Sequence, residues 1–532
     1  MDPAQDHRNG ECDFEGADPI TKTSLGLLGF GLLNVWLYAA LLPLWDGFDE
    51  PFHYGFVHEL SHSGSLPVSG RTMMPAELCE SLRLAPAGVV AQRNLKFALT
   101  HEEYLRLPPA ERQARRAALR SLPAAPEPGG CFVNYEAQQA PLAYAVLALP
   151  DLLLARAPLP DRILILRGIC GTIALLMLMA GFAMLSAELK LSDAVRDAAL
   201  LATLCVQMFY ATTTHITNDF LAAPLFTLLV ATSLRFFRTA AMRDGVVCAV
   251  TLAAALATKA YFLAVLPVFV VMLAVLWRSR RVAWTRVVLV VSVALLPSSW
   301  WYLRNLTLYG SLSGINQANG GATLPQALRS LLEIQWPASL AYMLRGMIWT
   351  GNNSFTAFSQ ATLNILLFVV GIGVALFLWR RRGNYLMAGY FGMFVAALIY
   401  SAGVFYFEAP GQSRGSSPWY ILPLVPALYL MATRGLGAWS APFLVLNVYV
   451  INATYVVKLI PQYGGYAGAR STPGALWNWY TQDLGIAANL RDLCLGPPVL
   501  IAVLTGLVLA GSVALCVTVV RNLSGAPAAN QE

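Results

Sequence analysis

The sequence predicts an all-α membrane protein that crosses the bilayer about twelve times, and three observations support that fold class. Hydrophobic residues make up 57% of the 532 residues and charged residues only 12%, which is too apolar for a soluble protein of this length. Apolar runs recur along the chain, each near the roughly 20 residues that a helix needs to cross a bilayer. Arginines cluster between these runs, as they do in cytoplasmic loops. The net charge of +7 therefore reflects membrane topology, and we exclude nucleic acid as a partner.

The first apolar run, from about Ser24 to Leu44, follows a polar segment that lacks the basic start and cleavage site of a signal peptide. We expect this segment, residues 1–21, to be a cytoplasmic tail and the run to remain as a membrane anchor. Acidic, imidazole and aromatic residues follow at once over residues 45–54. Placing charged carboxylates at this depth of a membrane costs free energy and usually marks a functional site, so this stretch is a candidate site. The alternative is an ordinary solvated loop at the start of a helix.

A long first outer loop, residues 45–161, is expected to carry several juxtamembrane helices. Its last part, residues 137–155, is apolar enough to cross the membrane, but the sidedness of the later loops predicts that it lies along the outer surface. The alternative is that 137–155 crosses and the N-terminus lies outside. Cys79 and Cys131 both fall in this loop and would pair in an oxidising compartment, a question that the sequence leaves open.

Twelve spans are expected, and the charges of the loops between them set their direction. They cover residues 24–44, 163–187, 197–215, 217–235, 244–258, 261–277, 286–303, 361–379, 385–406, 417–433, 437–459 and 497–520. Arginine clusters near Arg238, Arg280 and Arg381 should be cytoplasmic, which places both termini inside. We divide the chain into a main transmembrane domain, C-terminal helices and a cytoplasmic tail. These parts cover residues 22–435, residues 436–521 with an outer loop at 461–496, and residues 522–532.

The unusual polar residues collect in the turns that this topology places outside. They are Asp46, Asp49, Glu50, His53, Asn218, Asp219, Lys259, Arg304, Asn305 and the segment 408–414. Residues far apart in the sequence thus converge on one face of the membrane. The cysteines show no metal-binding or redox spacing, and we predict neither a metal nor a cofactor.

Several short motifs resemble those of the GT-C class of membrane glycosyltransferases, which use polyprenyl-phosphate sugars. Asp49-Glu50-Pro51-Phe52-His53-Tyr54 resembles the first-loop Asp-Glu-x-x-His motif of protein O-mannosyltransferases and lipid A aminoarabinose transferases. Tyr135-Glu136-Ala137-Gln138-Gln139-Ala140-Pro141-Leu142 is similar to their His-Pro-Pro-Leu-Tyr-Tyr segment, with Gln139 in place of the histidine. Asn218-Asp219, Thr258-Lys259 and Trp300-Trp301-Tyr302-Leu303-Arg304-Asn305 are similar to later turns of that class. The resemblance covers roughly residues 22–430.

The resemblance implies an enzyme of the bacterial inner membrane that works on the periplasmic face. It would transfer a sugar, with inversion, from a polyprenyl-phosphate donor to an envelope glycan, lipid or protein acceptor. Asp49 would be the base that takes the acceptor's proton, and Glu50 or Asp219 would orient the acceptor. Lys259, Arg304 and Arg414 would hold the donor phosphate. The expected substrate-binding residues are His53, Tyr54, Tyr135, Gln138, Asn218 and Asn305. Membrane lipids would surround the helices, with the donor's lipid tail between them.

Other interpretations of the same residues stay open. Lys259 could merely extend from a helix end, and Arg304 could cap its helix. His53 with two acids could bind a divalent ion, as in the oligosaccharyltransferase branch of the GT-C class. The Asp-x-Glu pair expected for that branch is absent around Asp219. The whole chain could instead be a transporter or flippase for lipid-linked or anionic solutes, although its charges lie at helix ends and no repeat is visible. A third possible function is that of an O-antigen ligase or polymerase, an enzyme that uses a diphosphate-linked oligosaccharide donor.

Overall fold

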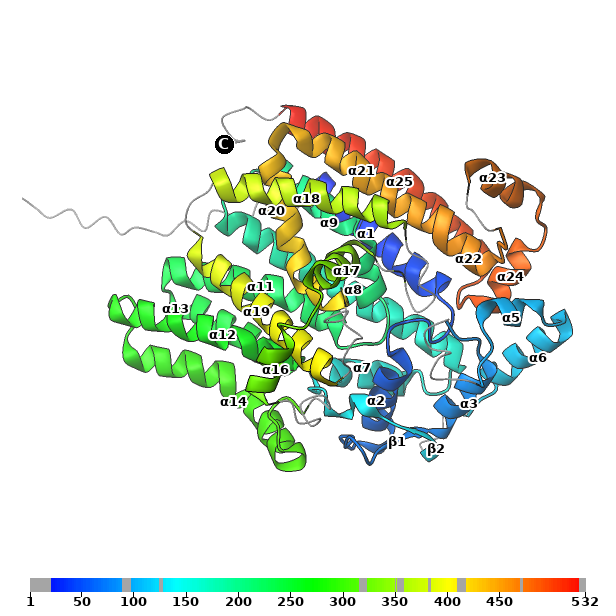
Figure 1. Cartoon of the computed structure of the whole chain (residues 1–532), viewed down its shortest axis with the longest axis horizontal. Coiled ribbons are helices and arrows are strands. Elements are labelled where there is room, and N and C mark those ends of the chain that lie inside the picture. Colours follow the sequence, from blue (N-terminus) through cyan, green and yellow to red (C-terminus); the bar gives the residue numbers. More distant parts are fainter. Residues whose placement is uncertain are drawn as a thin grey trace, which may run out of the picture.

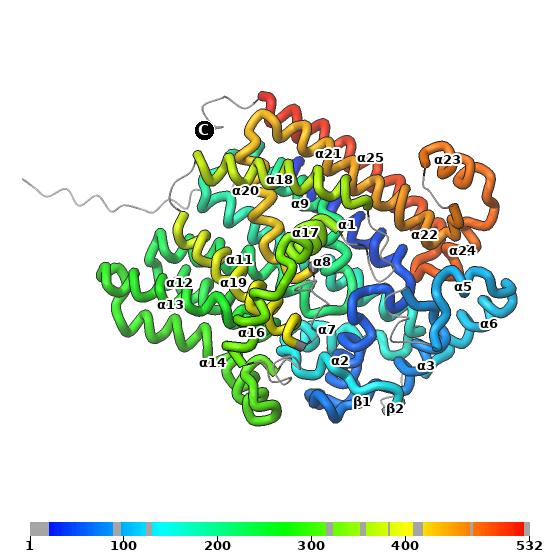
Figure 2. Tube along the Cα trace, viewed as in Figure 1, coloured from blue at the N-terminus to red at the C-terminus, as the bar shows by residue number. Residues whose placement is uncertain are grey.

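The computed structural model describes residues 21–88, 97–123, 128–314, 323–349, 351, 358–380, 384–408, 418–468 and 472–525. Within these ranges the chain is almost entirely helical, which confirms the all-α prediction, and the long helices lie side by side in one bundle (Figure 1). The Cα trace in Figure 2 follows the chain from the first helix, α1 (Lys22–Leu41), to the last, α25 (Pro498–Gly525). These two helices pack against each other, so the two ends of the described chain meet in one bundle.

Short elements fill the segment between α1 and the next long helix. They are α2 (Glu50–Ser63), β1 (Met73–Pro75), α3 (Ala76–Leu84), α5 (His101–Arg106), α6 (Pro109–Arg120), β2 (Pro128–Val133), η1 (Tyr135–Gln138) and α7 (Leu142–Leu153). Apolar α7 has 12 residues and is about 18 Å long, too short to cross the hydrocarbon core. Its length agrees with the prediction that residues 137–155 do not cross.

The remaining helices form the bulk of the molecule. They are α8 (Leu159–Glu188), α9 (Asp193–Leu204), α10 (Gln207–Thr213), α11 (Asp219–Thr239), α12 (Met242–Leu256), η2 (Ala260–Val265), α13 (Leu266–Arg278), α14 (Trp284–Tyr309), α16 (Leu324–Ser330), α17 (Trp336–Ile348), α18 (Gln360–Arg380), α19 (Tyr385–Glu408), η3 (Pro418–Leu424), α20 (Val425–Leu436), η4 (Gly437–Trp439), α21 (Ser440–Ala453), η5 (Thr454–Leu459), α22 (Ile460–Gly464), α23 (Pro473–Gln482) and α24 (Ile486–Leu493), followed by α25.

Nine helices among the described residues are long and apolar enough to cross a membrane, or ten if α9 and α10, bent by 62°, form one broken span. The protein is therefore an integral, multi-pass membrane protein. Two features explain why the structure has fewer candidate spans than the predicted twelve. Helix α12 has only 15 residues, and Trp419–Gly464, from η3 to α22, is one run of 46 residues where two spans were predicted. That run would be about 69 Å long if straight, but Gly437, with φ 56° and ψ −119°, breaks it between α20 and α21.

The outer faces of several long helices are apolar. Val271 on α13, Leu296 on α14, Phe368 on α18 and Val513 on α25 are each more than half exposed. Exposed apolar surface of this extent is unfavourable in water but matches lipid chains. The bundle thus has a surface suited to a bilayer.

Two glycines allow α18 and α20 to approach each other closely. A Cβ added at Gly435 would lie only 1.8 Å from the carbonyl oxygen of Gly373, and one added at Gly373 would lie 2.6 Å from the carbonyl oxygen of Ala432. Small residues are the usual means by which membrane helices bring their backbones together. This contact fixes α20, whose preceding segment η3 contributes to the site described below.

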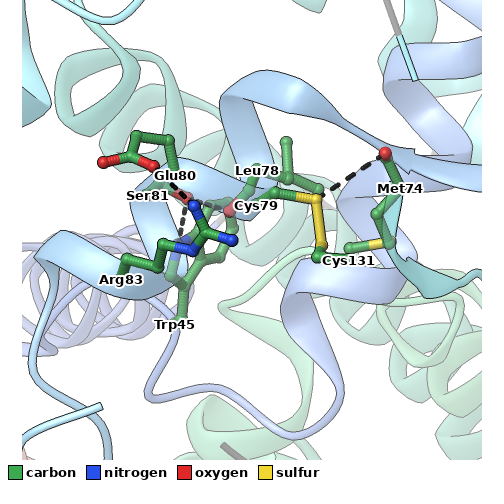
Figure 3. The surroundings of a disulfide bond; sticks show 8 residues. All are labelled: Trp45, Met74, Leu78, Cys79, Glu80, Ser81, Arg83 and Cys131. Carbon is green, nitrogen blue, oxygen red and sulfur yellow. Dashed lines mark hydrogen bonds and ion pairs between the residues drawn. A yellow bond between two sulfur atoms is a disulfide. The ribbon is translucent and has the colours of Figure 1, made fainter. Parts of the chain in front are cut away.

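The segment between α1 and α8 is held together by a pair of strands and a disulfide. Strands β1 and β2 pair antiparallel, with Met73 opposite Val133. A bond between Cys79 of α3 and Cys131 of β2 closes a 52-residue separation, which confirms that these cysteines pair (Figure 3). Strand β2 leads directly into η1, so the disulfide anchors the segment that carries Tyr135 and Glu136.

Candidate functional site

A polar pocket opens where five segments meet: the α1–α2 turn, η1, the α10–α11 turn, the end of α12 and η3. Its lining residues are Phe48, Asp49, His53, Glu136, Gln139, Thr212, His215, Thr217, Asn218, Asp219, Lys259, Trp419 and Tyr420. Five of the residues predicted as site residues are among them, namely Asp49, His53, Asn218, Asp219 and Lys259. The predicted convergence of distant turns therefore does produce a common cavity.

Asp49 lies at the mouth of this pocket. It precedes α2 in a left-handed conformation, φ 53°, and its carboxylate does not cap that helix. It accepts instead a hydrogen bond of 2.6 Å from the hydroxyl of Tyr135. The side chain keeps an exposed surface toward the cavity, yet protein surrounds it on the other sides. This withdrawal from water raises the pKa of Asp49, and the Tyr135 hydrogen bond offsets only part of the effect.

Glu50, the next residue, is fully buried outside the pocket. Arg167 of α8 holds both of its oxygens, at 2.8 and 2.5 Å, and also donates to the carbonyls of Leu42 and Pro43. The backbone N–H of Ile216 donates to Glu50 at 3.1 Å. Burial alone would raise the pKa of Glu50, but the charge and hydrogen bonds of Arg167 outweigh it and lower the pKa. Glu50 thus joins the α1–α2 turn to α8 and the α10–α11 turn.

An ion pair forms the opposite wall of the pocket. Lys259 Nζ lies 2.5 Å from Asp219 Oδ1, joining the break between α12 and η2 to the first residue of α11. The lysine ammonium also lies 5.3 Å from the ring centre of Tyr261 and 4.9 Å from that of Tyr420. An ammonium over aromatic faces is stabilised by their quadrupoles. The positive charge of Lys259 therefore faces the cavity while it is paired with Asp219.

His53 follows Asp49 by four residues and shares its side of α2, as the helical repeat requires. Its Nδ1 is 2.8 Å from the hydroxyl of Tyr144, and its Nε2 is 3.5 Å from that of Thr217. Burial lowers the pKa of His53 well below its ordinary value, so the ring is neutral near pH 7. This histidine supplies a polar but uncharged surface to the pocket.

Glu136 also lines the pocket, although the sequence did not single it out. Asn134 places it, because its side chain donates to the Phe52 carbonyl of α2 at 3.0 Å and accepts from the Glu136 N–H at 3.0 Å. Glu136 is buried, with Gln139 bonded to its carboxyl group and Oε2 without a partner among the described residues. Burial, together with the charge of Asp49, raises the pKa of Glu136 to about 8. This carboxyl group is therefore mostly protonated at pH 7.

Two further buried polar atoms face no partner in the described part of the chain. They are Nδ1 of His215 and Oδ1 of Asn218, and both residues line the pocket. The amide of Asn218 donates through its nitrogen to Oε1 of Gln139 at 3.0 Å. Buried polar atoms are normally hydrogen-bonded, so these two atoms are available to water or to a polar ligand in the cavity.

The other predicted site residues lie around the pocket rather than in its wall. Tyr135 reaches it through Asp49, while Asn305 of α14 donates to the Gln138 carbonyl at 3.3 Å and so supports η1. Arg304 donates to the carbonyl of Pro67 at 2.8 Å and stacks on Trp301. Arg414 lies outside the described residues.

Tyr54 points away from the pocket into a separate polar network. Its hydroxyl donates to Asp151 at 2.9 Å, and Arg162 lies over its ring. Glu50 and Tyr54 are four residues apart, so they share the inward side of α2 just as Asp49 and His53 share the pocket side. The predicted substrate contact of Tyr54 finds no support in this placement.

Helix α2 also carries His58-Glu59-Leu60-Ser61-His62, a spacing known from zinc peptidases. His58 lies 3.8 Å from Glu77, which Arg162 also contacts, and burial lowers the pKa of His58 to about 3. No group of three or more metal-ligating side chains is found in the part of the chain that the structure describes. The arginine beside Glu77 would repel a cation, so we interpret this network as structural.

Fold and site together define the class: an integral, multi-pass, all-α membrane protein with a pocket of carboxylates and one lysine at the ends of its helices. No protein-family model matches the sequence, and the comparison with curated proteins gives no match. The functional argument therefore rests on the pocket itself.

Proposed function

We propose that the protein is a membrane glycosyltransferase that takes a sugar from a polyprenyl-phosphate donor and attaches it to an envelope glycan, lipid or protein. The observation that carries this proposal is the position of Asp49, with its carboxylate open to a cavity whose far wall is Lys259. Acceptor activation requires a carboxylate, whereas a lipid phosphate leaves readily if a cation holds it. Both groups face one pocket at the ends of helices.

The proposed reaction uses Asp49 as the base. An acceptor hydroxyl gives its proton to Asp49 while its oxygen attacks the anomeric carbon. The bond from that carbon to the phosphate oxygen breaks, and its electron pair leaves with the polyprenyl phosphate. Attack opposite the leaving group inverts the anomeric centre. A raised pKa makes Asp49 a stronger base than an ordinary aspartate, provided it is deprotonated.

Lys259 would stabilise the phosphate that leaves. Because Asp219 already holds this lysine at 2.5 Å, the donor phosphate would share it or displace the aspartate. The donor and acceptor hydroxyls would satisfy the unpartnered atoms of Glu136, His215 and Asn218. The active site would face the periplasm, where the loop containing the Cys79–Cys131 bond would also meet oxidising conditions.

The test compares envelope glycans by mass spectrometry from cells with the wild-type protein, without it, and with single variants. We expect the deletion to remove one sugar from a glycan. Asp49→Asn should reproduce that loss at normal protein levels, with turnover lowered by about 10²–10⁴. Asp483→Asn, the same chemical change at an exposed loop position, is the matched control.

Unchanged turnover in well-folded Asp49→Asn, with Asp219→Asn inactive, would transfer the role of base to Asp219. Unchanged glycans in the deletion strain would reject the transferase altogether.

A transporter of lipid-linked or anionic solutes is the second candidate, and the 62° break between α9 and α10 favours it. Broken helices commonly frame the substrate sites of transporters. The outcome that would select this candidate is a lipid-linked or anionic solute that accumulates on one side of the membrane in the deletion strain without a change in glycan composition.

A further inference from the structure

A second cavity, with a volume of about 270 Å³, lies at the other end of the bundle. It is bounded by the α8–α9 turn, by the corner where α20 passes into α21, and by the end of α25. None of these segments contributes to the polar pocket.

Helix α11 separates the two cavities. It begins at Asp219 in the polar pocket and ends at Thr239, with Arg238 paired to Glu188, the last residue of α8. Its 21 residues span about 31 Å, the thickness of the hydrocarbon core. The second cavity therefore lies at the opposite membrane face, the one that the arginine clusters predict to be cytoplasmic.

Two cations from different segments line this cavity. Lys190 follows α8 in an exposed turn and makes no ion pair within the described ranges. Arg434 donates from Nη1 to the Leu189 carbonyl at 3.1 Å, and no carboxylate among the described residues pairs with it. A guanidinium has five N–H donors, so most of this group stays free for a ligand. The two cations together favour an anion.

The neighbouring carboxylates already have partners. Glu188 is bound to Arg238 at 2.8 Å, and Asp193 to Arg196 at 2.6 Å. The first N–H groups of a helix have no intrahelical acceptor, and the side chain of Ser192, which precedes α9 and lines the cavity, does not cap them. Free helix N–H groups add to the attraction for an anion.

The surroundings of the cavity fit a lipid. Trp439 follows the lining residue Ala438 and is 72% exposed, as is usual for tryptophans at the level of lipid headgroups. Exposed apolar side chains continue along the two flanking helices, at Val445 of α21 and at Val513 and Val517 of α25. A soluble anion would gain nothing from these apolar faces, whereas acyl chains would.

We propose that this cavity binds the headgroup of an anionic phospholipid from the leaflet opposite the polar pocket. The headgroup phosphate contacts Lys190 and Arg434, and the acyl chains lie on the exposed faces of α21 and α25. Basic cavities between helices on the cytoplasmic side recognise such headgroups in this way. The site is independent of the reaction proposed for the outer pocket.

The experiment measures lipid binding to the purified, full-length protein in neutral detergent, by native mass spectrometry and by the rise in Tm. The probes are phosphatidylglycerol, phosphatidylcholine and inorganic phosphate. We expect phosphatidylglycerol to bind and raise the Tm, while the other two do not. Lys190→Gln and Arg434→Gln should each weaken phosphatidylglycerol binding about fivefold, which corresponds to about 1 kcal/mol per cation.

Arg278→Gln is the matched control, since Arg278 is an exposed arginine outside the cavity and should leave binding unchanged. Arg434→Lys keeps the charge and should retain most of the affinity, which separates lost binding from lost folding. Equal binding of phosphatidylcholine, or phosphatidylglycerol binding that both Gln variants retain, would overturn the proposal. So would inorganic phosphate that raises the Tm as much as phosphatidylglycerol does, because the site would then bind free phosphate.

Discussion

The interior beneath the α1–α2 turn and the pocket beside it both contain carboxylates, but these differ in burial and in the number of their hydrogen-bond partners. Glu50 is fully buried, and its two oxygens are held by Arg167 and the Ile216 N–H. Asp49, its neighbour in sequence, accepts one side-chain hydrogen bond, from the Tyr135 hydroxyl, and has a surface open to the cavity. Glu136 is intermediate, since it is buried with one oxygen left unpartnered in the described chain.

This difference indicates which acids support the fold and which are available for chemistry. A buried carboxylate with all its hydrogen bonds made in the protein cannot lose its partner without a large cost, and it has no capacity left for a substrate. A carboxylate with a free oxygen toward a cavity can accept or donate a proton. Three changes test this distinction, beginning with the largest expected effect.

Glu50→Gln should destabilise the protein strongly, because it leaves the Arg167 guanidinium buried without its counter-charge. Losing one partner of a buried pair typically costs about 3–5 kcal/mol. The measurement is the unfolding free energy in detergent micelles. Glu59→Gln, at a partly exposed position of the same helix, is the control and should cost less than about 1 kcal/mol. A Glu50→Gln protein as stable as wild type would show that the buried Glu50 carboxylate does not support the fold.

Glu136→Gln should change the pH dependence of transfer rather than the fold. With a pKa of about 8, Glu136 is protonated and can donate a hydrogen bond at pH 7, and it loses that proton as the pH rises above 8. If the neutral form is required, wild-type transfer should fall about tenfold between pH 7 and pH 9. The glutamine variant never ionises, so its transfer should stay level over this range. A parallel decline in both proteins would contradict the role of Glu136.

Tyr135→Phe should have the smallest effect. The hydrogen bond from Tyr135 lowers the pKa of Asp49, so its removal should raise that pKa further. Because the base acts when deprotonated, transfer is lost as the pH falls through this pKa, and the acid side of the profile should move to higher pH. The plateau rate should change by less than about tenfold, since one hydrogen bond contributes about 1 kcal/mol. A profile unchanged on its acid side would contradict the proposed Tyr135–Asp49 coupling.

Much of the pocket could be predicted because helix ends that face the same side of a membrane must lie near one another. Asp49, Asp219 and Lys259 were found in this way. The helical repeat accounts for the shared face of Asp49 and His53, and the same repeat puts Glu50 and Tyr54 together on a different face. Their partners, Arg167 and Asp151, are more than 90 residues away, so no local pattern shows them.

Glu136 and His215 were missed because each lies in a turn rich in polar residues, 134–139 and 212–219, where no spacing distinguishes it from its neighbours. Their importance comes from burial, which a sequence does not display. The number of spans is a similar case. Helical residues continue from 419 to 464, and only the backbone angles of Gly437 show where the direction changes.

The Cys79–Cys131 bond has a consequence for when the pocket is assembled. The bond ties β2 to α3, and β2 leads directly into η1 with Tyr135 and Glu136, which form part of the site. On the reducing side of a membrane these thiols stay separate, and the segment before η1 lacks its covalent anchor. We therefore expect export of the first loop to be a maturation step, in which only chains that have reached the oxidising side acquire a fixed pocket wall.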